Sequence, residues 1–143
     1  MNRRDALFAT GALLAAGAAS AATDHSHHHH AGAHPWQAVL DTAGICIEKG
    51  EVCLTHCIML MGEGDKTMAA CASSVRDMLA SCRALITLAG AESKFAPKLA
   101  ALCVDVCKAC EAECKKHADK HKACKECMES CAECAKACKA KVA

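Results

Sequence analysis

The clearest pattern in the chain is the regular spacing, between residues 102 and 141, of the residues that a helix would bury. Cysteines recur there in steps of three and four residues, as in an apolar stripe. Residues three and four apart are neighbours on one face of an α-helix. The segment therefore predicts two helices, each with one face lined by cysteine. These cysteines are Cys103, Cys107, Cys110, Cys114, Cys124, Cys127, Cys131, Cys134 and Cys138.

Two further amphipathic helices are predicted upstream, over residues 35–61 and 66–89. A Gly-Glu-Gly run follows the first helix and Gly90 follows the second, while Asp65 suits the N-cap of the second. The inner faces of these two helices carry the remaining cysteines, which are Cys46, Cys53, Cys57, Cys71 and Cys82. Gly50, Val75 and Met78 take inner positions where a cysteine would also fit.

The third helix is predicted to begin near residue 93, with Pro97 in its first turns, and to end near His117. Asp119 is the expected cap of the fourth. Four helices joined by short links predict an all-α, antiparallel up-down-up-down four-helix bundle over residues 35–143. Steps of three and four suit knobs-into-holes packing. All four cysteine faces then meet on one axis and give a cysteine-lined core.

Residues 1–21 have the features of a twin-arginine signal peptide. Arg3 and Arg4 precede an apolar run that ends in Ala19-Ser20-Ala21, a pattern that suits signal peptidase. The run is too short for a stable membrane span, which needs about 20 residues. We expect cleavage near Ala21 and export to the periplasm. Residues 22–34 form a His-rich leader that either binds metal weakly or is simply solvated.

Composition narrows the possible functions. The net charge of +1 gives no reason to expect nucleic acid or an acidic membrane surface as a partner. The 14 cysteines in a short exported chain permit a disulfide-stabilised module. Cysteines four apart on a helix, however, have Cβ atoms roughly 5–6 Å apart, whereas a disulfide needs about 3.5–4.5 Å. Bridges between helices remain possible.

The soft thiolate ligands favour Cu(I). Zinc prefers paired cysteines on turns, and the spacing does not follow the ferredoxin pattern for iron–sulfur clusters. A linear Cu(I) site fits pairs such as Cys53/Cys57, Cys103/Cys107, Cys110/Cys114, Cys127/Cys131 and Cys134/Cys138. Charge balance requires on the order of one Cu(I) per bridging thiolate. Without metal, neutral thiols pack as small apolar groups, so the empty bundle can stay folded.

The two ends of the predicted bundle differ. One end, called here the open end, gathers imidazole and thioether groups, and we expect His56, Met61 and Met68 to admit copper there. His117 and His121 are expected to be solvated loop residues, Met59 to point away, and Met78 to fill the core. The opposite end is expected to be closed by apolar side chains, namely Trp36, Val39, Leu85, Ile86, Phe95 and Leu99.

The chain resembles the copper storage proteins. The resemblance lies in the Cys46-to-Cys53 segment, the Cys103-to-Cys110 run and the terminal helix with five cysteines. It implies a four-helix bundle that holds many Cu(I) ions on core cysteines, with histidine and methionine ligands at the open end. It also implies a homo-oligomer, for which we favour a tetramer, and a copper enzyme as a possible recipient.

Three other functions stay open. A thiol redox protein would need an exposed, activated cysteine, and a disulfide-stabilised module or a zinc–thiolate store would use the same residues differently. No nucleophile–base pair or paired carboxylates are recognisable, so we assign no catalytic residue and expect no enzymatic activity. The predicted metal ligands are therefore the 14 cysteines with His56, Met61 and Met68.

Overall fold

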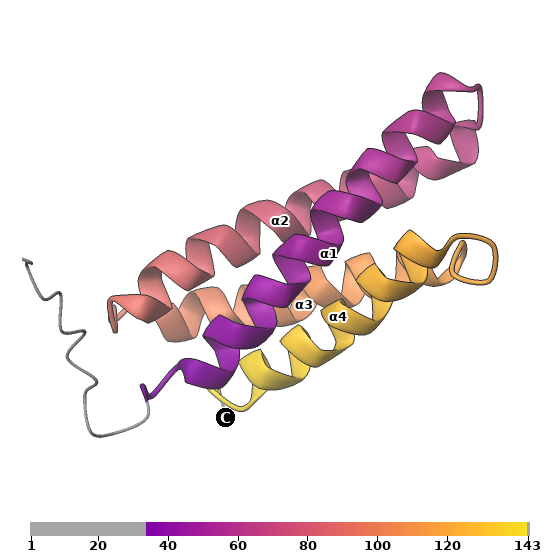
Figure 1. Cartoon of the computed structure of the whole chain (residues 1–143). Helices are drawn as coiled ribbons and strands as arrows, with labels where there is room; N and C mark the ends of the chain where they lie inside the picture. Colours follow the sequence, from indigo (N-terminus) through magenta and orange to yellow (C-terminus); the bar gives the residue numbers. More distant parts are fainter. Residues whose placement is uncertain (1–33, 143) are drawn as a thin grey trace, which may run out of the picture. The chain divides into compact units, whose positions relative to one another are not determined.

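The structure is a computed structural model that describes residues 34–142 (Figure 1). The predicted signal peptide and almost all of the His-rich leader lie outside these residues. The described part contains four α-helices, no strand, and a short 3₁₀ turn, η1. The bounds are α1 Gln37–Gly62, η1 Lys66–Met68, α2 Ala69–Gly90, α3 Ala96–Lys115 and α4 Lys122–Lys139. No helix among residues 34–142 has both the length and the apolar content needed to cross a membrane.

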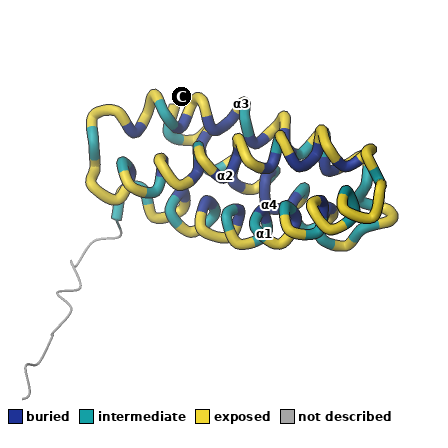
Figure 2. The backbone as a smooth tube through the Cα atoms, turned by 90° about the horizontal axis from the view of Figure 1, so that it is seen from above, coloured by how far each residue is buried: buried dark blue, intermediate teal, exposed yellow. Residues whose placement is uncertain are grey.

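Each helix packs against two others. The backbone of α1 packs beside α2 and α4, and that of α3 packs beside the same two helices. In the described chain the diagonal pairs α1–α3 and α2–α4 meet only through side chains in the core, as where Cys82 Sγ lies 3.9 Å from Cys134 Sγ. Short links between consecutive helices make neighbours antiparallel. The predicted all-α, up-down-up-down four-helix bundle is confirmed. Figure 2 shows the consequence along the backbone, where buried positions alternate with exposed ones on every helix.

The helix ends follow the sequence in most places. The Asp65 carboxylate accepts a hydrogen bond from the Thr67 N–H at 2.9 Å, so the predicted cap is confirmed, although the turn that it caps is 3₁₀. Gly64 has φ +99°, a backbone conformation that favours glycine. The predicted cap Asp119 is wrong. Successive backbone turns extend to His121, whose N–H donates to the His117 carbonyl at 3.0 Å, and α4 begins only after it.

Sulfur replaces most of the usual aliphatic core. All 14 cysteine side chains have 0% exposure, as the helical phase predicted. The other large side chains that are fully buried are few, and none is aromatic: Met68, Met78, Leu85, Val39 and Val75. Neutral thiols behave as small hydrophobic groups, so this core can hold the helices together without metal.

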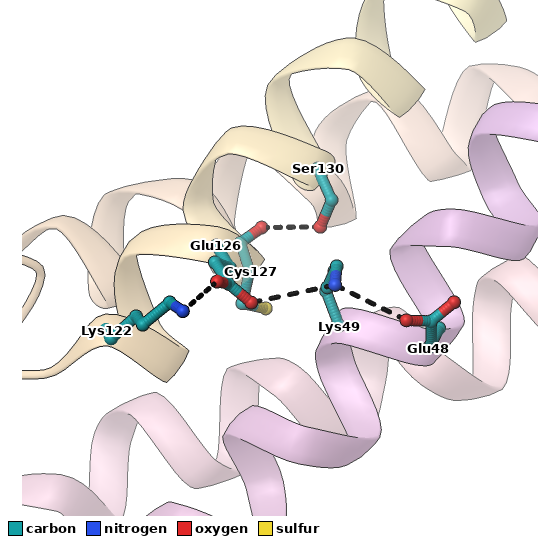
Figure 3. A network of polar contacts seen from close by, with 6 residues as sticks. All are labelled: Glu48, Lys49, Lys122, Glu126, Cys127 and Ser130. Atoms are coloured by element: carbon teal, nitrogen blue, oxygen red, sulfur yellow. Dashed lines mark hydrogen bonds and ion pairs between the residues drawn. The ribbon is translucent and has the colours of Figure 1, made fainter.

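The seam between α1 and α4 is closed on the outside by polar contacts (Figure 3). Lys49 reaches Glu126 of α4 at 3.6 Å, and Lys122 pairs with the same carboxylate at 3.4 Å. A hydrogen bond with Glu48 raises the pKa of Lys49, and both carboxylates attract its charge. The Ser130 hydroxyl donates to the Cys127 carbonyl at 2.9 Å. Exposed pairs contribute about 0–1 kcal/mol each, so the buried core provides most of the stability.

The end opposite the open end is apolar, but one expected residue does not close it. Val39 and Leu85 are fully buried, and Ile86 and Leu99 pack against the core. Phe95 is 58% exposed, so its predicted role in closing this end is wrong. Because Phe95 directly precedes α3, the first buried position of that helix falls to Ala96.

Candidate metal centre

The core sulfurs form four groups in which the Sγ atoms all lie within 4.8 Å of one another. The outer cluster contains Cys53, Cys57, Cys71 and Cys124, and belongs to the open end. Two middle clusters contain Cys53, Cys114 and Cys127, and then Cys110, Cys127 and Cys131. The inner cluster takes one cysteine from each helix: Cys46, Cys82, Cys107 and Cys134.

These groups are connected from one end of the bundle toward the other. Cys53 belongs both to the outer cluster and to the first middle cluster, and Cys127 belongs to both middle clusters. The inner cluster shares no cysteine with the other three groups. It is reached instead through the contact between Cys131 Sγ and Cys46 Sγ, at 3.6 Å. The thiols therefore form one continuous array rather than four separate sites.

Most close sulfur contacts join different helices. Cys71 Sγ lies 3.6 Å from Cys114 Sγ, and Cys110 Sγ lies 4.0 Å from both Cys127 Sγ and Cys114 Sγ. Among the predicted pairs on one helix, 53/57 and 127/131 each share a cluster and 110/114 are in contact. In each of these cases cysteines from another helix complete the group. The close groups of sulfurs in this core therefore combine cysteines from different helices.

Cys103 and Cys138 are fully buried but lie outside the four clusters. Both border the inner cluster. Hydrogen bonding with Cys134 and burial both raise the pKa of Cys138, and hydrogen bonding with Cys103 raises the pKa of Cys82. These two cysteines extend the array beyond the inner cluster.

The described cysteines are all free thiols. The close contacts that join them measure 3.6 Å or more, far longer than a disulfide bond of about 2 Å. The array in this structure is therefore a set of reduced thiols, and the core packs without any disulfide between helices.

Hydrogen bonds between thiols give cysteines in one cluster different proton affinities. In the inner cluster, hydrogen bonding with Cys107 lowers the pKa of Cys46 and lowers that of Cys134 to about 5. A thiolate is stabilised by the S–H groups that donate to it, and the donors in turn hold their protons. The pKa of Cys82 is accordingly raised. A metal ion that binds the whole cluster must therefore displace protons.

The open end places nitrogen and thioether groups beside the outer cluster. Met68 is fully buried and lies three residues before Cys71, while Met61 is half-buried and packs against the core. His56 Nε2 lies 3.0 Å from His121 Nδ1. Met59 is 60% exposed, which confirms that it points away from the core.

Sequence reasoning missed His121. It was expected to be a solvated loop residue, but its ring pairs with His56, and the His117 ring centroid lies 6.5 Å away. His121 precedes Cys124 by three residues and so continues the spacing of the α4 cysteines. That spacing was the available signal.

Met78 also lies among the core thiols. Its Sδ is 3.4 Å from Cys46 Sγ, and its side chain has 0% exposure. Helical phase placed it in the core, and its contact with a cluster cysteine depends on packing against Gly50 of α1, which phase alone does not describe.

Comparison with known proteins identifies the family. A family model described as "Copper storage protein" matches residues 32–143. The chain belongs to the copper storage protein family. This copper storage protein is similar to the solved structure of apo-Csp3 (copper storage protein 3) from Bacillus subtilis. The similarity has a TM-score of 0.66 and 27% identity, over 75% of this chain and 98% of that one.

Two further relatives agree with this placement. A solved structure titled Cu(I)-bound copper storage protein BsCsp3 gives a TM-score of 0.67 at 26% identity, covering 75% of this copper storage protein and 97% of that chain. An uncharacterised cysteine-rich protein, YhjQ of Bacillus subtilis strain 168, is 28% identical over 91 residues. These residues are 64% of this chain and 81% of the relative.

Proposed function

We propose that this protein stores Cu(I), and that it binds many ions along the array of buried thiols. The observation that carries the proposal is the continuity of the array, since neighbouring clusters share Cys53 and Cys127 or meet at the Cys46–Cys131 contact. Membership of the copper storage family supports it. So does the likeness to a structure titled Cu(I)-bound. The capacity should approach one ion per thiolate.

The shapes of the clusters favour copper over zinc. Structural zinc takes four ligands in a closed tetrahedral site, and only the outer and inner clusters offer four sulfurs. The middle clusters offer three sulfurs each and share Cys127. Cu(I) accepts two or three soft ligands, and bridging thiolates spread their charge over neighbouring ions. A store filled from end to end is therefore suited to Cu(I).

Burial argues for storage without catalysis. A redox-active cysteine needs a thiolate that solvent and substrate can reach, whereas every cysteine here has 0% exposure. The same burial protects bound Cu(I) from oxidants and small chelators. We therefore assign the cysteines to metal binding and assign none to thiol–disulfide exchange.

A competition titration at two pH values tests this function. The reduced, full-length protein should withdraw many equivalents of Cu(I) from a chromogenic chelator and should prefer Cu(I) to Zn²⁺. Thiols with raised pKa, such as Cys82, are protonated at pH 7, so uptake should release protons, and apparent affinity should fall as the pH is lowered. Uptake of one or two ions, or tighter binding of zinc, would show that the protein is not a copper store.

We further propose that copper is loaded at the open end through His56, Met61 and Met68, with His121 as an additional ligand. These groups lie next to the outer cluster in sequence and in packing. Neutral thioether and imidazole ligands bind Cu(I) less tightly than thiolates do, so an ion held there can pass inward.

Replacing Met61 and Met68 with leucine should slow loading and leave the final capacity almost unchanged. Leucine keeps a similar volume but removes both thioethers. Stopped-flow absorbance of the copper–thiolate bands measures the rate. Met59→Leu is the matched control, because Met59 is on α1 but 60% exposed. Equal rates in the double variant and the control would refute loading at this end.

The cellular setting is also a proposal. Residues 1–21 would direct export by the twin-arginine route, so that the protein folds with reduced thiols before it reaches the periplasm and supplies a copper enzyme there. The mass of the periplasmic protein tests cleavage near Ala21.

The exposed face of α1 supports a homo-oligomer, and we favour a tetramer. Three large apolar side chains are exposed there at intervals of seven residues: Ile45, Val52 and Met59. Light scattering that finds only monomers would exclude a homo-oligomer.

A further inference from the structure

The thioether of Met78 sits among the core thiols and away from the methionines of the open end. Met78 is fully buried on α2 and lies one turn before Cys82 of the inner cluster. Its Sδ is 3.4 Å from Cys46 Sγ, which is closer than the 3.6 Å between Cys46 Sγ and Cys131 Sγ. Besides the other three sulfurs of the inner cluster, Cys46 Sγ therefore contacts one thioether of α2 and one thiol of α4.

Gly50 on α1 leaves the space that Met78 occupies. A Cβ atom at residue 50 would lie 2.5 Å from Met78 Cε and 3.0 Å from Leu79 Cδ2. Both distances are too short for unstrained contact, so the long side chain fits in this position because residue 50 has no side chain. Glycine inside a helix is destabilising relative to alanine. The close approach of α1 to α2 here is thus matched to the Met78 side chain.

Met78 lies at the one break in the sharing of cysteines. The outer and middle clusters of the described core are joined by cysteines that they hold in common, whereas the inner cluster is joined to them by the Cys131–Cys46 contact. An ion that passes between shared cysteines keeps one ligand throughout. An ion that passes from Cys131 to Cys46 leaves one group of cysteines for another with which it shares no member. Met78 adds a third sulfur beside Cys46 at this step.

We propose that Met78 is a Cu(I) ligand in the middle of the bundle, where it helps to transfer copper from the middle clusters to the inner cluster. The proposal rests on the storage function proposed above and assigns a residue and a step within it. Met78 Sδ binds the ion together with Cys46 Sγ and Cys131 Sγ. This site takes soft metal ions with low coordination numbers, as thioether and thiolate ligands do.

The transfer requires no change in oxidation state. The bond from copper to Cys131 breaks as the bond to Cys46 forms, and Met78 keeps hold of the ion during the exchange. The proton of the Cys46 thiol moves to the Cys131 thiolate, along a contact in which either sulfur can donate. Because this proton moves in the direction opposite to the copper ion and the thioether is neutral, the charge of the site is the same before and after the step.

Selenium X-ray absorption tests for the bond directly. The full-length protein is labelled with selenomethionine in a Met61→Leu/Met68→Leu background, which removes the methionines of the open end, and is then loaded with Cu(I). A copper–selenium distance should appear in the spectrum and should be lost when Met78→Leu is added. Met1, Met59 and Met128 remain in both proteins, so the difference between the spectra reports Met78 alone. Identical spectra would overturn the proposal and leave Met78 as core packing.

Loading kinetics test the transfer step. Met78→Leu should slow the late phase, in which the inner cluster fills, by about tenfold, the scale on which a lost contact at a metal site changes binding. The early phase should be unchanged. Leucine conserves volume, and helical circular dichroism checks the fold. Full uptake with an unchanged late phase would contradict the proposed role of Met78 but not the storage function. Absence of uptake in the parent protein would contradict the storage function itself.

Discussion

Removal of the inner cluster is expected to lower the copper capacity by about four ions per chain, on the basis of one ion per thiolate. The variant replaces Cys46, Cys82, Cys107 and Cys134 with alanine. These cysteines come from four different helices and share no member with the other clusters. The remaining ten cysteines should therefore still bind copper. Metal analysis after gel filtration, normalised to protein concentration, measures the change.

A second variant provides a matched control for the position of the cluster. Alanine at Cys53, Cys57, Cys71 and Cys124 removes the same number of thiols from the outer cluster. It should lose a similar capacity, but it should also slow the filling of everything beyond it, because the outer cluster adjoins the open end. Each truncation leaves a small cavity with a cost that depends on local packing, so both variants need a check of helicity. Unchanged capacity in either variant would rule out these thiols as ligands.

Copper loading is expected to raise the melting temperature by more than about ten degrees. Ions in the clusters bind thiols from several helices at once, and the unfolded chain cannot bring these thiols together. A site saturated to 100 times its Kd adds about 2.7 kcal/mol to the free energy of unfolding, and about 1 kcal/mol shifts the Tm of a domain of this size by several degrees. Thermal melts followed by circular dichroism compare the metal-free and loaded protein.

The metal-free protein should nevertheless be helical before it is heated. Its buried cysteines pack as neutral thiols around Val39, Val75 and Leu85, and the four helices make continuous contacts. Binding would then stabilise a structure that already exists rather than create it. A metal-free chain without helical signal, or equal melting temperatures in both states, would contradict this view of the core.

The sequence predicted the parts of this structure that depend on helical phase. Steps of three and four residues place a side chain on one face of a helix whatever its partner, so the burial of all 14 cysteines followed from spacing. The same argument gave four helices and an antiparallel bundle. It also placed Met68 inside and Met59 outside.

Phase does not determine which side chains meet across the axis. The grouping of Cys46 with Cys131 and Met78 depends on how four helices approach one another, and Gly50 affects that approach. The position of His121 depends on a link made of successive backbone turns, which also displaced the expected cap at Asp119. Phe95 is exposed because it precedes the first buried turn of α3. These features come from tertiary packing and from the exact ends of helices.

Native mass spectrometry of the full-length protein during titration with Cu(I) tests the central claim most directly, because it counts the ions on each chain. The array of shared clusters predicts a progressive series of species that ends near one ion for each of the 14 cysteines. A series that stops at one or two ions per chain would contradict storage along the core.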